Sequence, residues 1–159
     1  QRLYISPEQA GFVWRAWEPM LERVFSALPN IDRRHCFIGG FSNGANATAA
    51  VLLGEQTREP FLRYFTNFVL VEGGHRIAPV PGLDGTTFLL VAGGKHSGHM
   101  QDIAENLKTA AGVDVTFHIM PDTGHSFPAP EKRWVGNWIR RRCGLDELPP
   151  PPDNDDKEE

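Results

Sequence analysis

The chain has 159 residues, of which 16 are lysine or arginine and 20 are aspartate or glutamate, so its formal net charge is −4. This length fits one domain with a real hydrophobic core. The acidic balance gives no electrostatic basis for binding nucleic acid, and no apolar run approaches the roughly 20 residues that span a bilayer. We therefore expect no nucleic-acid partner and no transmembrane segment, and the oligomeric state stays open.

Helices and strands alternate along the chain. Ser6 is a typical helix N-cap, and apolar residues follow it at helical spacing as far as Leu28, with Pro19 expected to kink or split this helix. Strands are predicted at 35–41, 65–71, 86–92 and 113–119. Further helices are predicted at 44–53, 99–111 and 130–143. The link between the second and third strands predicts a loop. This order indicates an α/β fold, with a parallel sheet of about four strands flanked by helices.

A serine lies at the turn between the first strand and the next helix, in Gly40-Phe41-Ser42-Asn43-Gly44. Glycines on both sides allow a tight bend that holds the serine beyond the strand end in a strained conformation. An N-cap serine alone does not explain both glycines. A serine hydroxyl attacks only when a base takes its proton, and His125 is the candidate base because it follows the last strand in Gly124-His125-Ser126.

These segments together resemble the C-terminal half of an α/β-hydrolase, from about residue 14 to residue 142. The resemblance is to esterases of the poly-hydroxybutyrate depolymerase-like, dienelactone-hydrolase-like and phospholipase/carboxylesterase-like branch. The segments that carry it are Ile31-Asp32-Arg33-Arg34, Gly40-Phe41-Ser42-Asn43-Gly44-Ala45, Phe88-Leu89-Leu90-Val91-Ala92-Gly93-Gly94-Lys95, Val113-Asp114-Val115-Thr116-Phe117 and Gly124-His125-Ser126-Phe127.

The resemblance implies a serine-dependent hydrolase that acts on a small carboxylic ester through an acyl-enzyme intermediate and needs no cofactor. The backbone N–H of Asn43 would be one oxyanion donor, and the second would come from a loop preceding residue 1. Residues 1–143 would form a hydrolase-like domain that lacks the N-terminal strands. Residues 144–159 are expected to be a disordered, acidic, proline-rich tail.

The catalytic acid departs from the family pattern. The family usually has an aspartate in the turn after the strand at 86–92, where this chain has His96. Glu72 directly follows the strand at 65–71, a position that some haloalkane dehalogenases use, and is our first choice. Asp102 on the next helix is the alternative, whereas Asp122 is too close to His125 along the chain to approach its ring correctly.

The histidines and the cysteines each allow more than one interpretation. His75, His96 and His99 are close in sequence, but no recognisable zinc pattern surrounds them, so we interpret them as surface or loop histidines and expect no metal. Cys36 and Cys143 either form a disulfide, which would indicate an oxidising, secreted or periplasmic setting, or stay unpaired. The competing functional hypothesis is a non-catalytic hydrolase-fold relative that binds or scaffolds, because His96 replaces the usual acid.

Overall fold

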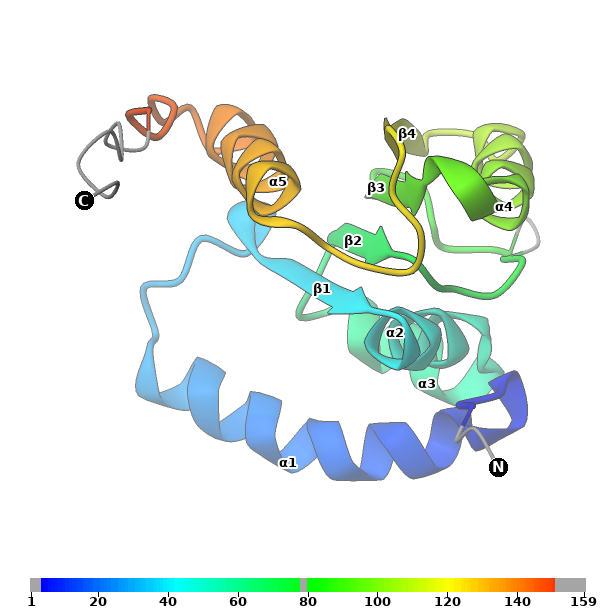
Figure 1. Cartoon of the computed structure of the whole chain (residues 1–159). Helices are drawn as coiled ribbons and strands as arrows, with labels where there is room; N and C mark the ends of the chain where they lie inside the picture. The colour runs from blue at the N-terminus through cyan, green and yellow to red at the C-terminus, as the bar shows by residue number, and fades with distance from the viewer. Residues whose placement is uncertain (1–3, 78–79, 151–159) are drawn as a thin grey trace, which may run out of the picture. The chain divides into compact units, whose positions relative to one another are not determined.

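The computed structural model describes residues 4–77 and 80–150 (Figure 1). The chain divides into two compact units, residues 1–126 and residues 127–159. The first unit contains the sheet. No described helix is long and apolar enough to cross a membrane. The two units are described separately.

The sheet of the first unit has four parallel strands in the order β1-β2-β3-β4. They are β1 (Phe37–Phe41), β2 (Asn67–Val71), β3 (Thr87–Gly93) and β4 (Asp114–Met120). Every residue of β2 and β3 is buried, as expected for the middle strands of a parallel sheet. The predicted fold class, an α/β fold with a four-stranded parallel sheet, is confirmed.

Four α-helices accompany this sheet: α1 (Ala10–Ala27), α2 (Asn43–Leu53), α3 (Glu55–Leu62) and α4 (Gly98–Lys108). Short 3-10 turns at Pro7–Gln9, Arg33–His35 and Gly94–His96 complete the unit. Of the two expected effects of Pro19, a kink or a split, the split is wrong, because α1 is one continuous helix through this residue. Residues 15 and 19 are both exposed, so water can satisfy the carbonyl that proline leaves without a partner. Helix α3 was not predicted, because only Thr57 and Phe61 in its eight residues are buried.

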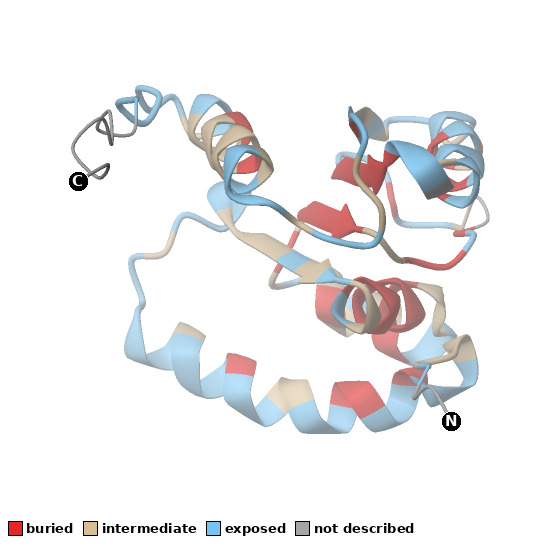
Figure 2. Cartoon of the chain, viewed as in Figure 1, coloured by how far each residue is buried: buried red, intermediate tan, exposed pale blue. Residues whose placement is uncertain are grey.

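One face of the sheet carries the main hydrophobic core. Alternate residues of the middle strands, such as Phe68 and Phe88, pack there with helical residues such as Trp14, Leu52 and Ile103. The Phe68 and Phe88 rings stack with their centroids 4.9 Å apart. Since α1, α2, α3 and α4 all contribute to this one cluster, they cover the same face of the sheet. Figure 2 shows that β2, β3 and most of α2 are buried. This core fixes the strand ends that carry the site.

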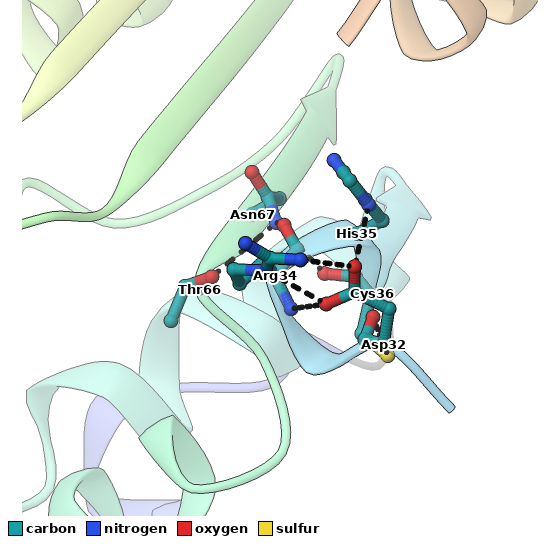
Figure 3. A network of polar contacts seen from close by, with 6 residues as sticks. All are labelled: Asp32, Arg34, His35, Cys36, Thr66 and Asn67. Atoms are coloured by element: carbon teal, nitrogen blue, oxygen red, sulfur yellow. Dashed lines mark hydrogen bonds and ion pairs between the residues drawn. The ribbon is translucent and has the colours of Figure 1, made fainter. Parts of the chain in front are cut away.

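A polar network closes the amino end of the sheet (Figure 3). Asp32 accepts hydrogen bonds from the backbone and guanidinium of Arg34, which lower the pKa of its carboxyl to about 2. Asn67, the first residue of β2, donates from Nδ2 to the carbonyls of Arg34 and Cys36 at 2.9 and 3.1 Å. These bonds fasten β2 to the segment that precedes β1, at the opposite end of the strands from Ser42.

The cysteines form no disulfide in the described part of the chain: Cys36 and Cys143 are both free. Burial raises the pKa of the Cys36 thiol, whose Sγ lies 3.5 Å from the Asp32 carbonyl. Of the two alternatives that the sequence left open, the structure therefore has the unpaired one.

The second unit consists of α5 (Ala129–Arg142) and the segment after it. Residues 145–148 run back along this helix: the Leu148 N–H donates to Asn137 Oδ1 at 2.9 Å, and Arg141 pairs with Glu147. These residues belong to the segment expected to be disordered from 144 onward. Residues 151–159 of that segment lie outside the described residues.

Candidate functional site

The site begins with the bend after β1. Ser42 has φ 53° and ψ −115°, a conformation that L-residues rarely adopt, and its N–H donates to the Val71 carbonyl at 2.8 Å. Gly40 makes the bend sterically feasible, because a Cβ there would lie 2.2 Å from the carbonyl carbon of Gly44. The sequence pattern of two glycines around the serine therefore corresponds to a strand that turns sharply into α2.

His125 lies between two oxygen-bearing side chains. Its Nε2 is 2.9 Å from Ser42 Oγ, and its Nδ1 is 3.1 Å from Glu72 Oε2. A carboxylate oxygen only accepts hydrogen bonds, so Nδ1 carries the proton in this contact, and Nε2 is left to accept from the serine hydroxyl. The structure thus brings together three residues that are 30 and 53 positions apart along the chain.

The carboxylate of Glu72 is held at the end of β2. Its side chain is only 6% exposed, whereas that of His125 is 55% exposed. One carboxylate oxygen faces His125, and the other accepts a hydrogen bond from the Gly93 N–H at the end of β3. Gly93 also lets the histidine loop approach, because a Cβ there would lie 2.4 Å from the Gly124 carbonyl oxygen. Two neighbouring strand ends therefore position the Glu72 carboxylate and the His125 imidazole.

The other predicted acids lie elsewhere. Asp102 on α4 is exposed and lines a separate surface hollow with Arg76 and Glu105. Asp122 is exposed in the histidine loop, with φ 53°. His96 lies in the 3-10 turn after β3, and its side chain is outside the described part of the structure. Among the candidate carboxylates, only Glu72 contacts the His125 ring in the described residues.

A hollow of about 750 Å³ opens beside Ser42. It is lined by Tyr4, Ser42, Asn43, Asn46, Glu72, Gly73, Gly74, His99, Met100 and His125. None of these residues is a lysine or an arginine. Asn43, the residue whose backbone N–H was predicted to stabilise an oxyanion, is the first residue of α2 and lies on this wall. The hollow is large enough for a small organic substrate next to the serine hydroxyl.

Two of the three neighbouring histidines have defined protein partners. His75 is buried, with Nε2 2.8 Å from the Ile5 carbonyl and Nδ1 2.9 Å from the Tyr4 hydroxyl. Burial lowers the pKa of His75. His99 Nε2 lies 3.0 Å from the Gly74 carbonyl. Among the described residues, no three His, Cys, Asp or Glu side chains are grouped to hold a metal ion.

Sequence reasoning missed the residues that hold the loop after β2, which begins with Glu72, against α2. Gly73 lies so close to Ser42 that a Cβ on it would be 2.4 Å from the Ser42 carbonyl oxygen. Asn46, buried in the first turns of α2, accepts a hydrogen bond from the Gly74 N–H at 2.7 Å. The available signal was the glycine pair directly after Glu72, because glycines at a strand end often mark a close backbone approach.

Comparison with known proteins identifies the fold. No protein-family model and no curated protein matches the chain. The structure of SOBER1 from Arabidopsis thaliana is 22% identical, with a TM-score of 0.59, and the match covers 82% of this chain and 64% of that one. A variant of the same protein gives a TM-score of 0.65 at 20% identity, covering 87% and 67%.

The Bacillus cereus carboxylesterase is 21% identical, with a TM-score of 0.63, and the match covers 89% of this chain and 67% of that one. The chain therefore spans about two thirds of the length of these structures. Its parallel sheet and the helices around it match theirs in arrangement. This chain therefore shares the α/β fold of these structures.

Proposed function

We propose that this chain is a serine hydrolase that acts on carboxylic esters, with Ser42 as nucleophile, His125 as general base and Glu72 as the acid that orients His125. The carrying observation is the pair of contacts on the His125 ring, 2.9 Å from Nε2 to Ser42 Oγ and 3.1 Å from Nδ1 to Glu72 Oε2. An imidazole placed between a hydroxyl and a carboxylate is the arrangement that activates serine in this type of chemistry.

In the proposed first step, Ser42 Oγ forms a bond to the acyl carbon of the ester while its proton moves to His125 Nε2. Glu72 keeps Nδ1 protonated and stabilises the positive charge that the imidazolium then carries. The proton on Nε2 passes to the departing alcohol as the ester C–O bond breaks. This leaves an acyl-enzyme on Ser42, and neutral His125 is ready to accept a second proton.

In the proposed second step, His125 takes a proton from water, and the oxygen of that water attacks the acyl carbon. The bond to Ser42 Oγ breaks, Oγ regains the proton, and a carboxylic acid is released. In both steps negative charge develops on the acyl oxygen, for which the Asn43 backbone N–H is our proposed donor. One such donor is worth about 10²- to 10³-fold in rate.

The lining of the hollow favours an uncharged acyl group. Glu72 brings a carboxylate to its wall, and no lysine or arginine lines it among the residues that the structure describes. An anionic substrate would be desolvated there without a compensating cation. The similarity to the Bacillus cereus carboxylesterase agrees with a carboxylic ester as the substrate class.

A serine-directed fluorophosphonate probe and p-nitrophenyl acetate test the proposal. The wild-type protein should be labelled and should release p-nitrophenol, and Ser42→Ala should abolish both. Ser26→Ala, at an exposed position on α1, is the matched control and should behave as the wild type. Equal labelling and hydrolysis by the wild type and Ser42→Ala would reject the enzyme and favour a non-catalytic hydrolase-fold protein.

A further inference from the structure

We propose that Asn46 is a positioning residue that locks the acid-bearing loop to the helix after the nucleophile, so that Glu72 and Ser42 keep a fixed mutual geometry. This inference rests on the proposed function, since it assigns a role within the same site. Asn46 is 7% exposed and lies one helical turn after Ser42, whose carbonyl accepts the Asn46 N–H at 3.0 Å. It is thereby part of the bend that holds the nucleophile.

The orientation of the Asn46 amide follows from its partners. The Gly74 N–H only donates, so the atom 2.7 Å from it is Oδ1. The Nδ2 group then donates to Asn43 Oδ1 at 3.3 Å, and this oxygen also accepts from the Ile5 N–H at 3.4 Å. The network therefore ties together α2, the N-terminal segment and the loop after β2.

The loop after β2 depends on this bond because of its sequence. Gly73 and Gly74 directly follow Glu72, and Gly74 has φ 136°, a conformation that few other residues adopt. Because two consecutive glycines give the backbone much conformational freedom, this loop needs hydrogen bonds to other elements to stay in place. The Gly74 N–H bond to Asn46 is buried, and the Gly74 carbonyl lies 3.0 Å from His99 Nε2.

The same loop lies in close contact with the backbone of Ser42. Because a Cβ on Gly73 would lie 2.4 Å from the Ser42 carbonyl oxygen, a small shift of this loop displaces the bend, Glu72 or both. Misplacement of a reacting group by about 1 Å can cost 100-fold in rate. Asn46 touches neither the reacting hydroxyl nor the imidazole in the described contacts, and its backbone bond to the Ser42 carbonyl does not depend on its side chain. We therefore assign the effect of its side chain to the Gly74 N–H and, through that loop, to the position of Glu72.

Steady-state kinetics of p-nitrophenyl acetate hydrolysis test this role in a double-mutant cycle. Asn46→Ala should lower kcat by about 10- to 100-fold with little change in KM. In a Glu72→Gln background the same substitution should change kcat by less than about twofold, because the group through which it acts is gone. An equal loss of kcat in both backgrounds would overturn the proposal and leave a general structural role.

Asn67→Ala is the matched control. Asn67 is also 7% exposed, and its amide also bonds to backbone, but at the amino end of β2 (Figure 3). It should leave kcat near the wild-type value. Should Asn46→Ala fail to fold, Asn46→Asp keeps an acceptor for the Gly74 N–H and should retain kcat within about threefold. If kcat fell by 10-fold or more in Asn46→Asp, the hydrogen bond to the Gly74 N–H would not be the interaction through which Asn46 acts.

Amide hydrogen exchange gives a readout that does not depend on activity. Exchange of the Gly74 amide should be about 10-fold or more faster in Asn46→Ala than in the wild type or Asn67→Ala, because the buried N–H loses its acceptor. Unchanged exchange of the Gly74 amide would overturn the proposal that Asn46 holds this loop, even if activity fell. Full hydrolysis by Ser42→Ala would instead reject the proposed function and the catalytic role of Asn46 with it, while the exchange result would still report whether the loop is held.

Discussion

Ser42 and Glu72 occupy equivalent places on two paired strands, and both have a positive φ. Phe41 pairs with Val71 in the parallel register, and the next residue on each strand has a left-handed φ, 53° at Ser42 and 52° at Glu72. Such conformations cost about 1–3 kcal/mol each in non-glycine residues. Two adjacent strands are therefore each followed by a non-glycine residue with a positive φ, and His125 contacts both side chains.

The first prediction concerns the acid. Glu72→Gln keeps the size of the side chain but removes the charge that, in the proposed mechanism, stabilises the His125 imidazolium, so kcat should fall by about 10³- to 10⁴-fold. Asp102→Asn is the control, because Asp102 lines a different hollow, and its kcat should match the wild type. The measurement is p-nitrophenyl acetate hydrolysis at pH 7.5. A larger loss with Asp102→Asn than with Glu72→Gln would reverse the assignment.

A second prediction concerns the contact between the loop after β2 and the nucleophile. Gly73→Ala would place a methyl group 2.4 Å from the Ser42 carbonyl oxygen, so the backbone has to move. We expect the free energy of unfolding to fall by about 1–3 kcal/mol, the usual cost of overpacking. We also expect kcat to fall by about 10-fold or more. Urea unfolding monitored by circular dichroism measures the first quantity.

The control for Gly73→Ala is Gly11→Ala. Gly11 lies in α1, is exposed, and has no atom within 4 Å of an added Cβ. Alanine should stabilise this helix position by about 0.5–1 kcal/mol without changing kcat. If Gly73→Ala proved as stable and active as Gly11→Ala, the close approach of the loop to Ser42 would have no consequence for the site.

The sequence predicts the strands and the bend well, because their signals are local. Buried parallel strands appear as short apolar runs, and Gly40 before Ser42 marks a turn that a side chain at that position would block. The expectation that Gly44 is needed for the same reason is wrong, because a Cβ there would meet no atom within 4 Å. Helix α3 gave no such signal, since its burial is limited to Thr57 and Phe61. Pro19 gave a misleading one, because its missing hydrogen bond lies on the exposed side of α1, where water can replace it.

The candidate site also depends on contacts between residues that are far apart in the sequence, and such contacts leave no local signal. The sequence provides the residue types and the order of Ser42 and His125, but three carboxylates competed for the acid position. Strand pairing decides which carboxylate reaches the imidazole, and that pairing is non-local. The buried amide of Asn46 left no sequence signal of its own, because its partner, the Gly74 N–H, is a backbone group 28 residues away.

A third prediction concerns the charge of the acyl group. The kcat/KM for p-nitrophenyl butyrate should exceed that for the mono-p-nitrophenyl ester of succinate, which has a four-carbon acyl chain ending in a carboxylate. We expect a difference of about 10-fold or more, because the described lining of the hollow offers Glu72 but no cation. Equal values for the two esters, at low salt and at 0.5 M salt, would contradict the reading of the hollow as a site for uncharged groups.

The last prediction concerns pH and His75. Burial lowers the pKa of His75 in the folded protein below its ordinary value of about 6.5, with smaller influences from the Ile5 carbonyl, His99 and Glu8. Below about pH 6.5 the unfolded chain therefore binds a proton at this residue more readily than the folded protein does. The contribution of neutral His75 to stability is complete above that pH and is lost as the pH falls.

Thermal unfolding at pH 8.5, 7.5 and 5.5 measures this effect. The wild type should lose more Tm between pH 7.5 and 5.5 than His75→Gln does, by on the order of a few degrees for a chain of this size. Between pH 8.5 and 7.5 the two proteins should change in parallel, since His75 is neutral in both states there. A parallel loss between pH 7.5 and 5.5 as well would mean that folding leaves the proton affinity of His75 unaltered, despite its burial between Tyr4 and Ile5.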